Sequence, residues 1–249
     1  DSWAYTGHCA YYASNGCNNW KTGCEKCDFF RDYPRSICCN SAENFQLKKY
    51  LFTNAYIVAV SQWLGNEIRQ SFLHNLPLTV ITNGVDVFSF QPTNVKRDNK
   101  LTIVGVANNW EPRKNFDFYV NIAKQLPDAQ INIVGNVAYA QKIKCTSNIK
   151  LLGHISDANR LSEIYSSADV YINASREETF GMTTIEALAC GTPVIVNNAT
   201  ALPEIVTSDT GLIVDIDNID AVINAIHSIT NSHINYHETC RNHRSEEHT

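Results

Sequence analysis

The sequence predicts an α/β fold with one complete doubly wound parallel-sheet domain, together with the carboxyl-terminal part of a second domain of the same kind. Short apolar runs such as "LTIVGVA" (101–107) and "INIVG" (131–135) have the length of buried strands, and segments with apolar residues at helical spacing separate them. Strands that alternate with helices form right-handed βαβ units, in which helices cover both faces of a parallel sheet. The alternation after residue 100 is the basis of this prediction.

The expected elements of the complete domain have short connections. We expect strands at 101–107, 131–135, 149–153, 169–174, 193–196 and 211–214, and helices at 115–126, 157–167, 181–190, 202–206 and 218–230. An Asn-Gly turn and a polar stretch with a proline place a domain boundary near residues 84–97. We therefore assign 84–240 to the complete domain and 1–83 to the end of the other.

The two ends of the chain have less regular patterns. Residues 41–55 predict a helix behind a Ser41 cap, and 56–73 predict a strand that leads into an amphipathic helix. Residues 1–40 are rich in Cys, Asn and aromatic residues and have no clear apolar periodicity. This indicates an irregular segment that needs a local cross-link to hold its structure. Because the chain begins at Asp1 and not at Met, we expect its true start upstream. Residues 241–249 lack apolar periodicity, and we expect them to be a non-native tail outside the fold.

Charge and hydropathy argue against two classes of function. The 20 Lys and Arg residues against 25 Asp and Glu give a net charge of −5 without a basic run, so nucleic acid is not an expected partner. The longest apolar stretches, such as "YIVAV" and "PVIV", are far shorter than the roughly 20 residues of a membrane span. We therefore expect a soluble chain that is at most peripheral to a membrane.

Ligands of doubly wound sheets bind at the carboxyl ends of the strands, which draws attention to "SREETFGMTTIEALACGTPVIV" after the strand at 169–174. Gly181 lets backbone approach a ligand closely, and the N–H groups of Met182, Thr183 and Thr184 at a helix start suit a diphosphate. Glu186, one turn further, could accept hydrogen bonds from ribose hydroxyls. The alternative is that Glu177 and Glu178 are favourable charges at a helix start, that Glu186 is solvated, and that Gly191 is a C-cap.

The whole string resembles the motif of glycosyltransferase family 4, whose members are retaining enzymes with the two-domain GT-B fold. Glu178 and Glu186 match its Glu-x7-Glu motif, and "EALACGTPVI", "ALPEIV" and "TGLIVD" follow in the expected order. The resemblance extends back through Lys114 in "EPRKN" to "NGVD" (83–86), the usual end of the first domain, and covers nearly all of residues 1–230.

This resemblance implies an enzyme that moves a sugar from a nucleotide diphosphate-sugar to a glycan or lipid-linked acceptor in cell-surface polysaccharide biosynthesis, with retention of configuration. It implies that Glu178 acts on the transferred sugar and that Gly105 lies in the donor-binding region. It also implies that no catalytic metal and no covalent nucleophile take part. The expected location is the cytoplasm, with peripheral attachment at the inner face of the plasma membrane through the part of the first domain that precedes Asp1.

Arg113 and Lys114 form a basic pair at the start of a helix. The family pattern has Gly-Arg before its phosphate-binding lysine, whereas Asn108 and Asn109 stand there in this chain. The alternative is an exposed pair without function, in a place where the helix dipole disfavours cations. That unfavourable placement favours a catalytic role, in which both cations stabilise a departing nucleoside diphosphate.

Six of the nine cysteines lie in the first forty residues, which favours a reducing compartment with a local cysteine site. Four of them, Cys9, Cys17, Cys24 and Cys27, could complete a tetrahedral structural zinc site. The alternative is a set of buried free thiols. The segments "DSWAYTGHC", "GCNNWKTGC" and "CDFFRDYP" resemble an insert of colanic-acid and capsule glycosyltransferases of the same family. For His8 we expect a structural role, with acceptor contact or metal ligation as alternatives.

Other classes of function fit less well. A dinucleotide-dependent oxidoreductase would need Gly-x-Gly-x-x-Gly after a strand, and the sequence lacks this motif. A zinc-stapled nucleic-acid-binding module conflicts with the acidic charge and the single Cys-x2-Cys pair. A non-catalytic protein that binds nucleotide sugars remains the alternative to an enzyme.

Overall fold

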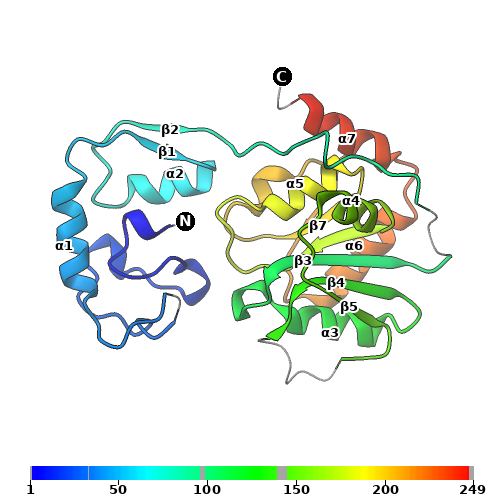
Figure 1. Cartoon of the computed structure of the whole chain (residues 1–249), viewed down its shortest axis with the longest axis horizontal. Helices are drawn as coiled ribbons and strands as arrows, with labels where there is room; N and C mark the ends of the chain where they lie inside the picture. Colours follow the sequence, from blue (N-terminus) through cyan, green and yellow to red (C-terminus); the bar gives the residue numbers. More distant parts are fainter. Residues whose placement is uncertain (1, 33, 96–98, 139–144, 247–249) are drawn as a thin grey trace. The chain divides into compact units, whose positions relative to one another are not determined.

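The computed structural model describes residues 2–32, 34–95, 99–138 and 145–246, which form two compact units (Figure 1). Unit 1 comprises Asp1–Asn83 with Glu177–Phe180, and unit 2 comprises Gly84–Arg176 with Gly181–Thr249. The units divide between Asn83 and Gly84, the position at which the sequence analysis places its boundary. The short segment 177–180 belongs to unit 1 although the residues on both sides of it belong to unit 2.

Unit 2 is built on a six-stranded parallel sheet with the strand order β5-β4-β3-β6-β7-β8. The strands are β3 (Thr102–Asn109), β4 (Gln130–Asn136), β5 (Ile149–Gly153), β6 (Val170–Asn173), β7 (Val194–Asn197) and β8 (Gly211–Val214). The chain winds outward from β3 to β5 and then returns to pair β6 with the other side of β3, so its direction reverses between β3 and β6. The predicted α/β, doubly wound class is therefore confirmed.

Helices cover the sheet in two groups (Figure 1). The helices are α3 (Phe116–Gln125), α4 (Ala158–Ser166), α5 (Met182–Ala189) and α6 (Ile219–Thr230), and a 3-10 helix, η6 (Leu202–Ile205), follows β7. Helix α3 packs with α6, while α4 and α5 contact each other. The apolar faces of α3 and α6 enclose strand residues such as Ile103, Ile133 and Ile172 in one core. In the described part of the chain, none of the helices combines the length and apolarity needed to span a membrane.

The last helix, α7 (Tyr236–Glu246), corrects the expectation that 241–249 stand outside the fold. It contacts α5, and the Arg241 guanidinium donates hydrogen bonds to three backbone carbonyls. These are the oxygens of Val87 (3.0 Å), Phe90 (2.9 Å) and Ala189 (3.1 Å). Apolar periodicity missed this helix, since polar side chains such as Arg241 and Thr239 make several of its contacts. Residues 247–249 lie outside the described residues.

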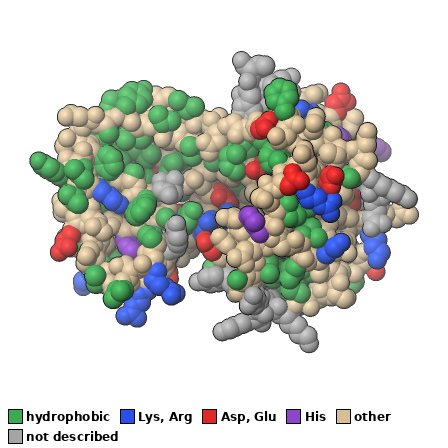
Figure 2. All heavy atoms as spheres, in the orientation of Figure 1, with side chains coloured by type: hydrophobic (Ala, Val, Ile, Leu, Met, Phe, Trp, Pro, Cys, Tyr) green, Lys and Arg blue, Asp and Glu red, His purple; other side chains and the backbone are tan. Residues whose placement is uncertain are grey.

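Unit 1 combines α1 (Ser41–Leu51), α2 (Gln62–Arg69) and two parallel strands, β1 (Ile57–Ala59) and β2 (Leu78–Val80). Residues 2–32 and 34–40, here named the Cys-rich segment, contain only short 3-10 helices: η1 (Ser2–Ala4), η2 (Ala13–Asn15) and η3 (Asn19–Lys21). The rings of Tyr5, Tyr12 and Trp20 pack together inside it. Figure 2 shows hydrophobic side chains exposed over this unit. The exposed hydrophobic residues of unit 1 include Leu47, Tyr50, Leu51, Tyr56 and Val58.

Two serines at helix starts behave differently. Ser61 precedes α2, and its hydroxyl accepts a hydrogen bond from the Leu64 N–H at 3.1 Å, as an N-cap does. The predicted cap Ser41 is instead the first residue of α1, and Asn40 occupies the N-cap position. The Ser41 hydroxyl donates to the Cys24 carbonyl at 2.8 Å. The expected cap is therefore wrong because this hydroxyl fastens the Cys-rich segment to α1.

Gly105 lies in the middle of β3 against the ring of Tyr119 from α3. A Cβ atom at residue 105 would be 2.5 Å from Tyr119 Cε1 and 2.6 Å from Cζ. Tyr119 is buried and its hydroxyl donates to the Ile172 carbonyl at 2.6 Å, so the ring is held in place. The structure gives Gly105 a packing role. Its predicted place in the donor-binding region stays a prediction.

We expect Gly105→Ala to destabilise the protein by about 1–3 kcal/mol, because the added methyl group overpacks a ring that cannot move. Urea unfolding measures the change. Tyr119→Leu should be destabilising alone, but the double variant should be less destabilised than the sum of the two single changes. Additive losses would show that the ring does not limit the size of residue 105.

Candidate functional site

The reversal between β3 and β6 locates a candidate ligand-binding edge of unit 2. In doubly wound sheets a crevice opens at the carboxyl ends of the strands where winding changes direction. The loops after β3 and β6 meet there, since the Arg176 N–H donates to the Arg113 carbonyl at 2.8 Å. A cavity of about 580 Å³ lies at the other edge, lined among others by Leu101, Asp169 and Pro193, which precede strands. We place the candidate site at the carboxyl edge.

The loop after β3 is anchored by Trp110, whose side chain is buried. Its indole N–H donates to the Val134 carbonyl at 3.0 Å, and its backbone N–H donates to the Asn136 carbonyl at 3.0 Å. The next residues turn as a 3-10 helix, η4 (Pro112–Lys114), before Asn115 adopts the left-handed conformation with φ of 58°. This turn places the predicted pair Arg113 and Lys114 directly before α3.

The charge of Arg113 is shared with a neighbouring carboxylate. Its Nε lies 3.1 Å from Glu111 Oε2, and both side chains are partly buried. Arg113 therefore brings an acidic partner to the loop. Both predicted cations stay candidates for contact with an incoming phosphate.

Helix α5 begins with a glycine that the geometry requires. Gly181 has φ of +105°, and a Cβ atom there would lie 2.9 Å from Leu202 Cδ2 of η6. Among the described residues, the N–H groups of Met182 and Thr183 have no hydrogen-bond acceptor. The expectation for Thr184 is wrong, since its N–H donates to the Gly181 carbonyl at 2.9 Å. The helix start therefore offers two amides to an anion, supported by the helix dipole.

The hydroxyls of the first turn fasten α5 to strand β6. Thr183 Oγ1 lies 2.7 Å from the Tyr171 hydroxyl, and Thr184 Oγ1 accepts a hydrogen bond from Asn173 Nδ2 at 3.0 Å. Tyr171 and Asn173 belong to β6 and are buried. These bonds hold the helix N-terminus in a fixed place at the carboxyl edge of the sheet.

Glu186 is not the solvated helix residue of the alternative interpretation. Its carboxylate accepts a hydrogen bond from the buried Tyr165 hydroxyl at 2.9 Å. Burial raises its pKa to about 7, and the Tyr165 hydrogen bond opposes this shift. Its charge therefore changes near neutral pH, and a ligand hydroxyl that donates to it would favour the ionised form.

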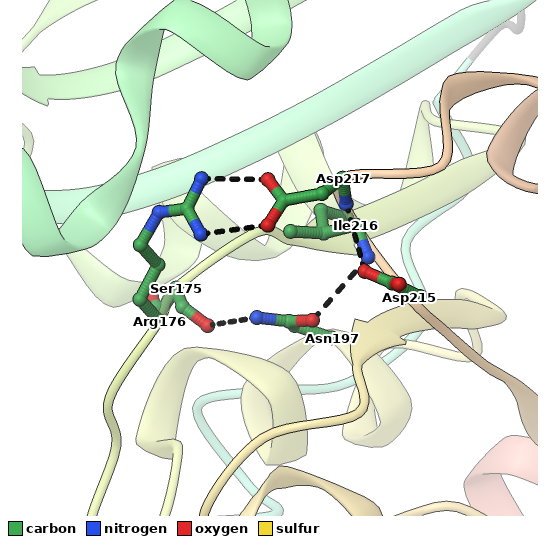
Figure 3. Close-up of polar contacts among 6 residues, drawn as sticks. All are labelled: Ser175, Arg176, Asn197, Asp215, Ile216 and Asp217. Atoms are coloured by element: carbon green, nitrogen blue, oxygen red, sulfur yellow. Dashed lines mark hydrogen bonds and ion pairs between the residues drawn. The ribbon is translucent and has the colours of Figure 1, made fainter. Parts of the chain in front are cut away.

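The sequence analysis missed a polar network that joins three neighbouring strand ends (Figure 3). Arg176, after β6, forms a bidentate pair with Asp217, at 2.6 Å and 2.9 Å. This pair lowers the pKa of Asp217. The buried Asn197 at the end of β7 donates to the Ser175 carbonyl at 3.0 Å and accepts from the Ile216 N–H at 3.4 Å. The signal in the sequence that could have identified this network is the general rule that sites form at the carboxyl ends of strands.

Glu177 and Glu178 belong to unit 1. Glu177 is fully buried, and its carboxylate accepts hydrogen bonds from the N–H groups of Tyr12 (3.0 Å) and Ser14 (2.9 Å). It is therefore an anchor of the loop and not a solvated charge at a helix start. Glu178, the predicted catalytic acidic residue, is half-buried beside it.

The predicted zinc ligands are close together in unit 1. Cys9, Cys17, Cys24 and Cys27 line one small cavity, whereas Cys38 and Cys39 are exposed. Within the residues that the structure describes, no three His, Cys, Asp or Glu side chains already have the geometry of metal ligands.

The raised pKa of Glu186 predicts that stability falls as pH rises. The folded protein holds a proton up to about pH 7, whereas the unfolded chain loses it near the ordinary value of 4.5. The protonated Glu186 contributes its full stabilisation below pH 4.5. As pH rises toward 7, the free energy of unfolding falls by up to about 1.4 kcal/mol per pH unit. Urea unfolding from pH 5 to 8 should show this loss in the wild type but not in Glu186→Gln. Glu163→Gln, an exposed carboxylate on α4, is the control; an equal slope in all three proteins would contradict the prediction.

Sequence comparison relates the chain to enzymes that transfer sugars. Residues 87–246 match the family of glycosyl transferases group 1. The chain is 32% identical over 122 residues to a GDP-mannose-dependent alpha-(1-6)-phosphatidylinositol dimannoside mannosyltransferase of Mycobacterium tuberculosis, covering 48% of this chain and 32% of the relative. It is 22% identical over 223 residues to a putative colanic acid biosynthesis glycosyl transferase, WcaC, of Escherichia coli, covering 85% and 53%. The chain thus spans about half the length of this second relative, and less of the first.

Structural comparison agrees with the sequence comparison. Sucrose-phosphate synthase from Thermosynechococcus elongatus superposes with a TM-score of 0.71 at 24% identity, over 82% of this chain and 57% of that one. Anabaena HepE in complex with UDP and glucose superposes with a TM-score of 0.67 at 17% identity, over 82% and 61%. At these identities the likeness shows the fold alone, and that fold is GT-B. With the family match over most of unit 2, the chain belongs to the glycosyl transferases group 1 family.

Proposed function

We propose that this chain contains the donor site of a retaining family 4 glycosyltransferase, which moves a sugar from a nucleotide diphosphate-sugar to a glycan or lipid-linked acceptor in cell-surface polysaccharide biosynthesis. The observation that supports this most is the start of α5 at the β3–β6 reversal, where the Met182 and Thr183 amides are available to an anion. The relatives that transfer mannose, and the HepE structure with UDP and glucose, are consistent with such a donor.

In this proposal the diphosphate lies on the α5 N-terminus and is contacted by Lys114, with Arg113 in support. Glu186 lies four residues after Met182, about 6 Å along the helix axis, and accepts hydrogen bonds from the ribose hydroxyls. Its burial makes the contact strong, because few water molecules compete for the carboxylate. Glu178 is assigned to the transferred sugar by its place in the motif.

The proposed chemistry is electrostatic. As the bond from the sugar to the diphosphate breaks, negative charge develops on the leaving oxygen. The Lys114 ammonium, the Arg113 guanidinium and the dipole of α5 stabilise that charge. The acceptor hydroxyl attacks on the face that the diphosphate leaves, so configuration is retained without a covalent nucleophile or a catalytic metal. The acceptor itself, and attachment at the inner face of the plasma membrane, are part of the same proposal.

One observation favours a second candidate, a protein that binds nucleotide sugars without transferring them. Arg113 already forms an ion pair with Glu111, which reduces the positive charge available to a leaving group. Slow hydrolysis of donor sugars separates the two candidates, because a catalytic site releases nucleoside diphosphate from a nucleotide sugar even without an acceptor. Binding without such release would support the second candidate.

We expect Glu186→Gln to weaken nucleoside diphosphate binding by about 1–3 kcal/mol, or roughly 5- to 150-fold, because a buried acceptor of two ribose hydrogen bonds is replaced by an amide. Calorimetry with UDP and GDP measures the change, and Glu163→Gln serves as the control. In the wild type, affinity should fall below pH 7, since a protonated Glu186 has lost the charge that the hydroxyls favour. Affinity that is independent of pH and of this substitution would remove Glu186 from the site.

We expect Lys114→Ala to weaken binding of the diphosphates by about 1.5–3 kcal/mol but to leave the corresponding nucleosides unaffected, because the lysine contacts only phosphate. Lys124→Ala, which changes an exposed lysine in the last turn of α3, should bind like the wild type. Equal losses for nucleosides and diphosphates would show that Lys114 supports the fold of the loop and not the phosphate.

A further inference from the structure

Four thiols of the Cys-rich segment surround one small cavity in unit 1. Cys9, Cys17, Cys24 and Cys27 all line it, together with His8 and Trp20 among other residues. Its volume of about 10 Å³ is near the lower limit for a single water molecule. Side chains spread over residues 9–27 therefore converge on a space of the size of one ion.

One pair of sulfur atoms, those of Cys9 and Cys27, is spaced for a metal and not for a disulfide. Cys9 Sγ and Cys27 Sγ are 4.0 Å apart. Zinc–sulfur bonds of about 2.3 Å in a tetrahedral site place the ligand sulfurs about 3.8 Å from one another. A disulfide requires about 2.05 Å. Cys17 and Cys24 line the same cavity as this pair.

A backbone N–H group points at one of the four sulfurs. The Gly7 N–H donates to Cys24 Sγ at 3.2 Å. Such donors stabilise thiolates and orient metal ligands. Glycine at residue 7 permits the close approach, since a Cβ atom there would lie 2.8 Å from Cys24 Cβ and 2.1 Å from the Ser41 oxygen. Cys24 itself has φ of 55°, a strained conformation that persists only where surrounding contacts hold it.

A cation next to the cavity complements a site of negative charge. Lys48 of α1 donates hydrogen bonds from Nζ to the carbonyls of Trp3 (2.6 Å) and Thr6 (2.8 Å), which places it beside the segment. Four thiolates around Zn²⁺ have a net charge of −2, which a nearby ammonium stabilises in a partly buried place.

We propose that Cys9, Cys17, Cys24 and Cys27 bind one structural zinc ion, and that this ion holds residues 12–14 where they anchor Glu177. Each of the four thiols loses one proton as its sulfur bonds to the metal. Small rotations of the side chains toward the cavity complete the tetrahedron, since the described side chains do not yet have ligand geometry. The Cys-rich segment has no regular sheet or long helix of its own, so the metal supplies the missing constraint.

The link to Glu177 follows from the position of its partners. Tyr12 and Ser14, whose N–H groups bind the Glu177 carboxylate, lie between the ligands Cys9 and Cys17. A closed metal loop fixes the direction of these two amides. Glu177 is thereby a positioning residue for the loop 177–180, and only the importance of this loop for Glu178 rests on the proposed function.

Metal content tests the first part of the proposal. Protein purified under reducing conditions without added metal should contain about one zinc per chain by elemental analysis. Replacement by Co²⁺ should give the intense visible absorption of a tetrahedral thiolate site. Single replacement of Cys9, Cys17, Cys24 or Cys27 by Ser should abolish stoichiometric zinc, while the exposed Cys38→Ser keeps it. Loss of zinc in His8→Gln or Cys39→Ser, with retention in Cys17→Ser, would overturn the ligand set.

If a cysteine variant does not fold, the wild-type protein can still test whether the four thiols bind zinc. Removal of the metal by a chelator should change the fluorescence of Trp20, which lines the cavity, and Trp20→Phe should abolish that change. Readdition of zinc should restore it. A metal-free protein that takes up neither zinc nor cobalt would overturn the proposal. Nucleotide binding is measured separately, so failure of the zinc proposal leaves the proposed function testable.

Hydrogen exchange tests the link to Glu177. In the zinc-bound protein the amides of Tyr12 and Ser14 should exchange slowly, because they donate to a buried carboxylate. Glu177→Gln should speed exchange at these two amides and leave the zinc content unchanged. Zinc removal should speed exchange at the same amides in the wild type. Unchanged exchange after zinc removal would show that the metal does not hold this loop.

Discussion

Strand β6 pairs with the side of β3 that β4 leaves free, and the candidate site of unit 2 depends on that pairing. Ile103 pairs with Val170 and Val104 with Tyr171, although the strands are distant in sequence. Asp169 reinforces the start of the pair, since its N–H donates to the Thr102 carbonyl at 2.9 Å and its carboxylate accepts from the Thr102 N–H at 2.8 Å. Because the strands are parallel, this register brings the loops after both to one edge.

Local periodicity was sufficient to predict this sheet. Strands buried on both faces are apolar runs, and the expected strands of 84–240 all occur within two residues of their predicted bounds. Helix α7 and the anchor Glu177 could not be predicted in the same way. In each, a charged side chain binds backbone groups far away in the sequence, Arg241 to three carbonyls and Glu177 to two amides. No local sequence pattern predicts such contacts.

The site was predictable in its residue types but not in its hydrogen bonds. Spacing identified Gly181 and Glu186, yet the loss of the Thr184 amide follows from how tightly the first turn winds after a left-handed glycine. The burial of Glu186 against Tyr165 depends on the packing of α4 on α5. The Arg176–Asp217 pair joins loops after β6 and β8, and only the strand order makes them neighbours. Tertiary structure therefore decides which polar groups remain available.

The contact between Gly105 and Tyr119 has a consequence for how related chains are compared. A glycine in the strand before a phosphate-binding loop is easily taken for a ligand contact when it recurs among relatives. Here the space of its absent side chain is filled by a ring whose hydroxyl binds the neighbouring strand. Positions 105 and 119 should therefore covary, with larger residues at the first accompanied by smaller ones at the second. A contact with the donor would instead keep the glycine whatever stands at position 119.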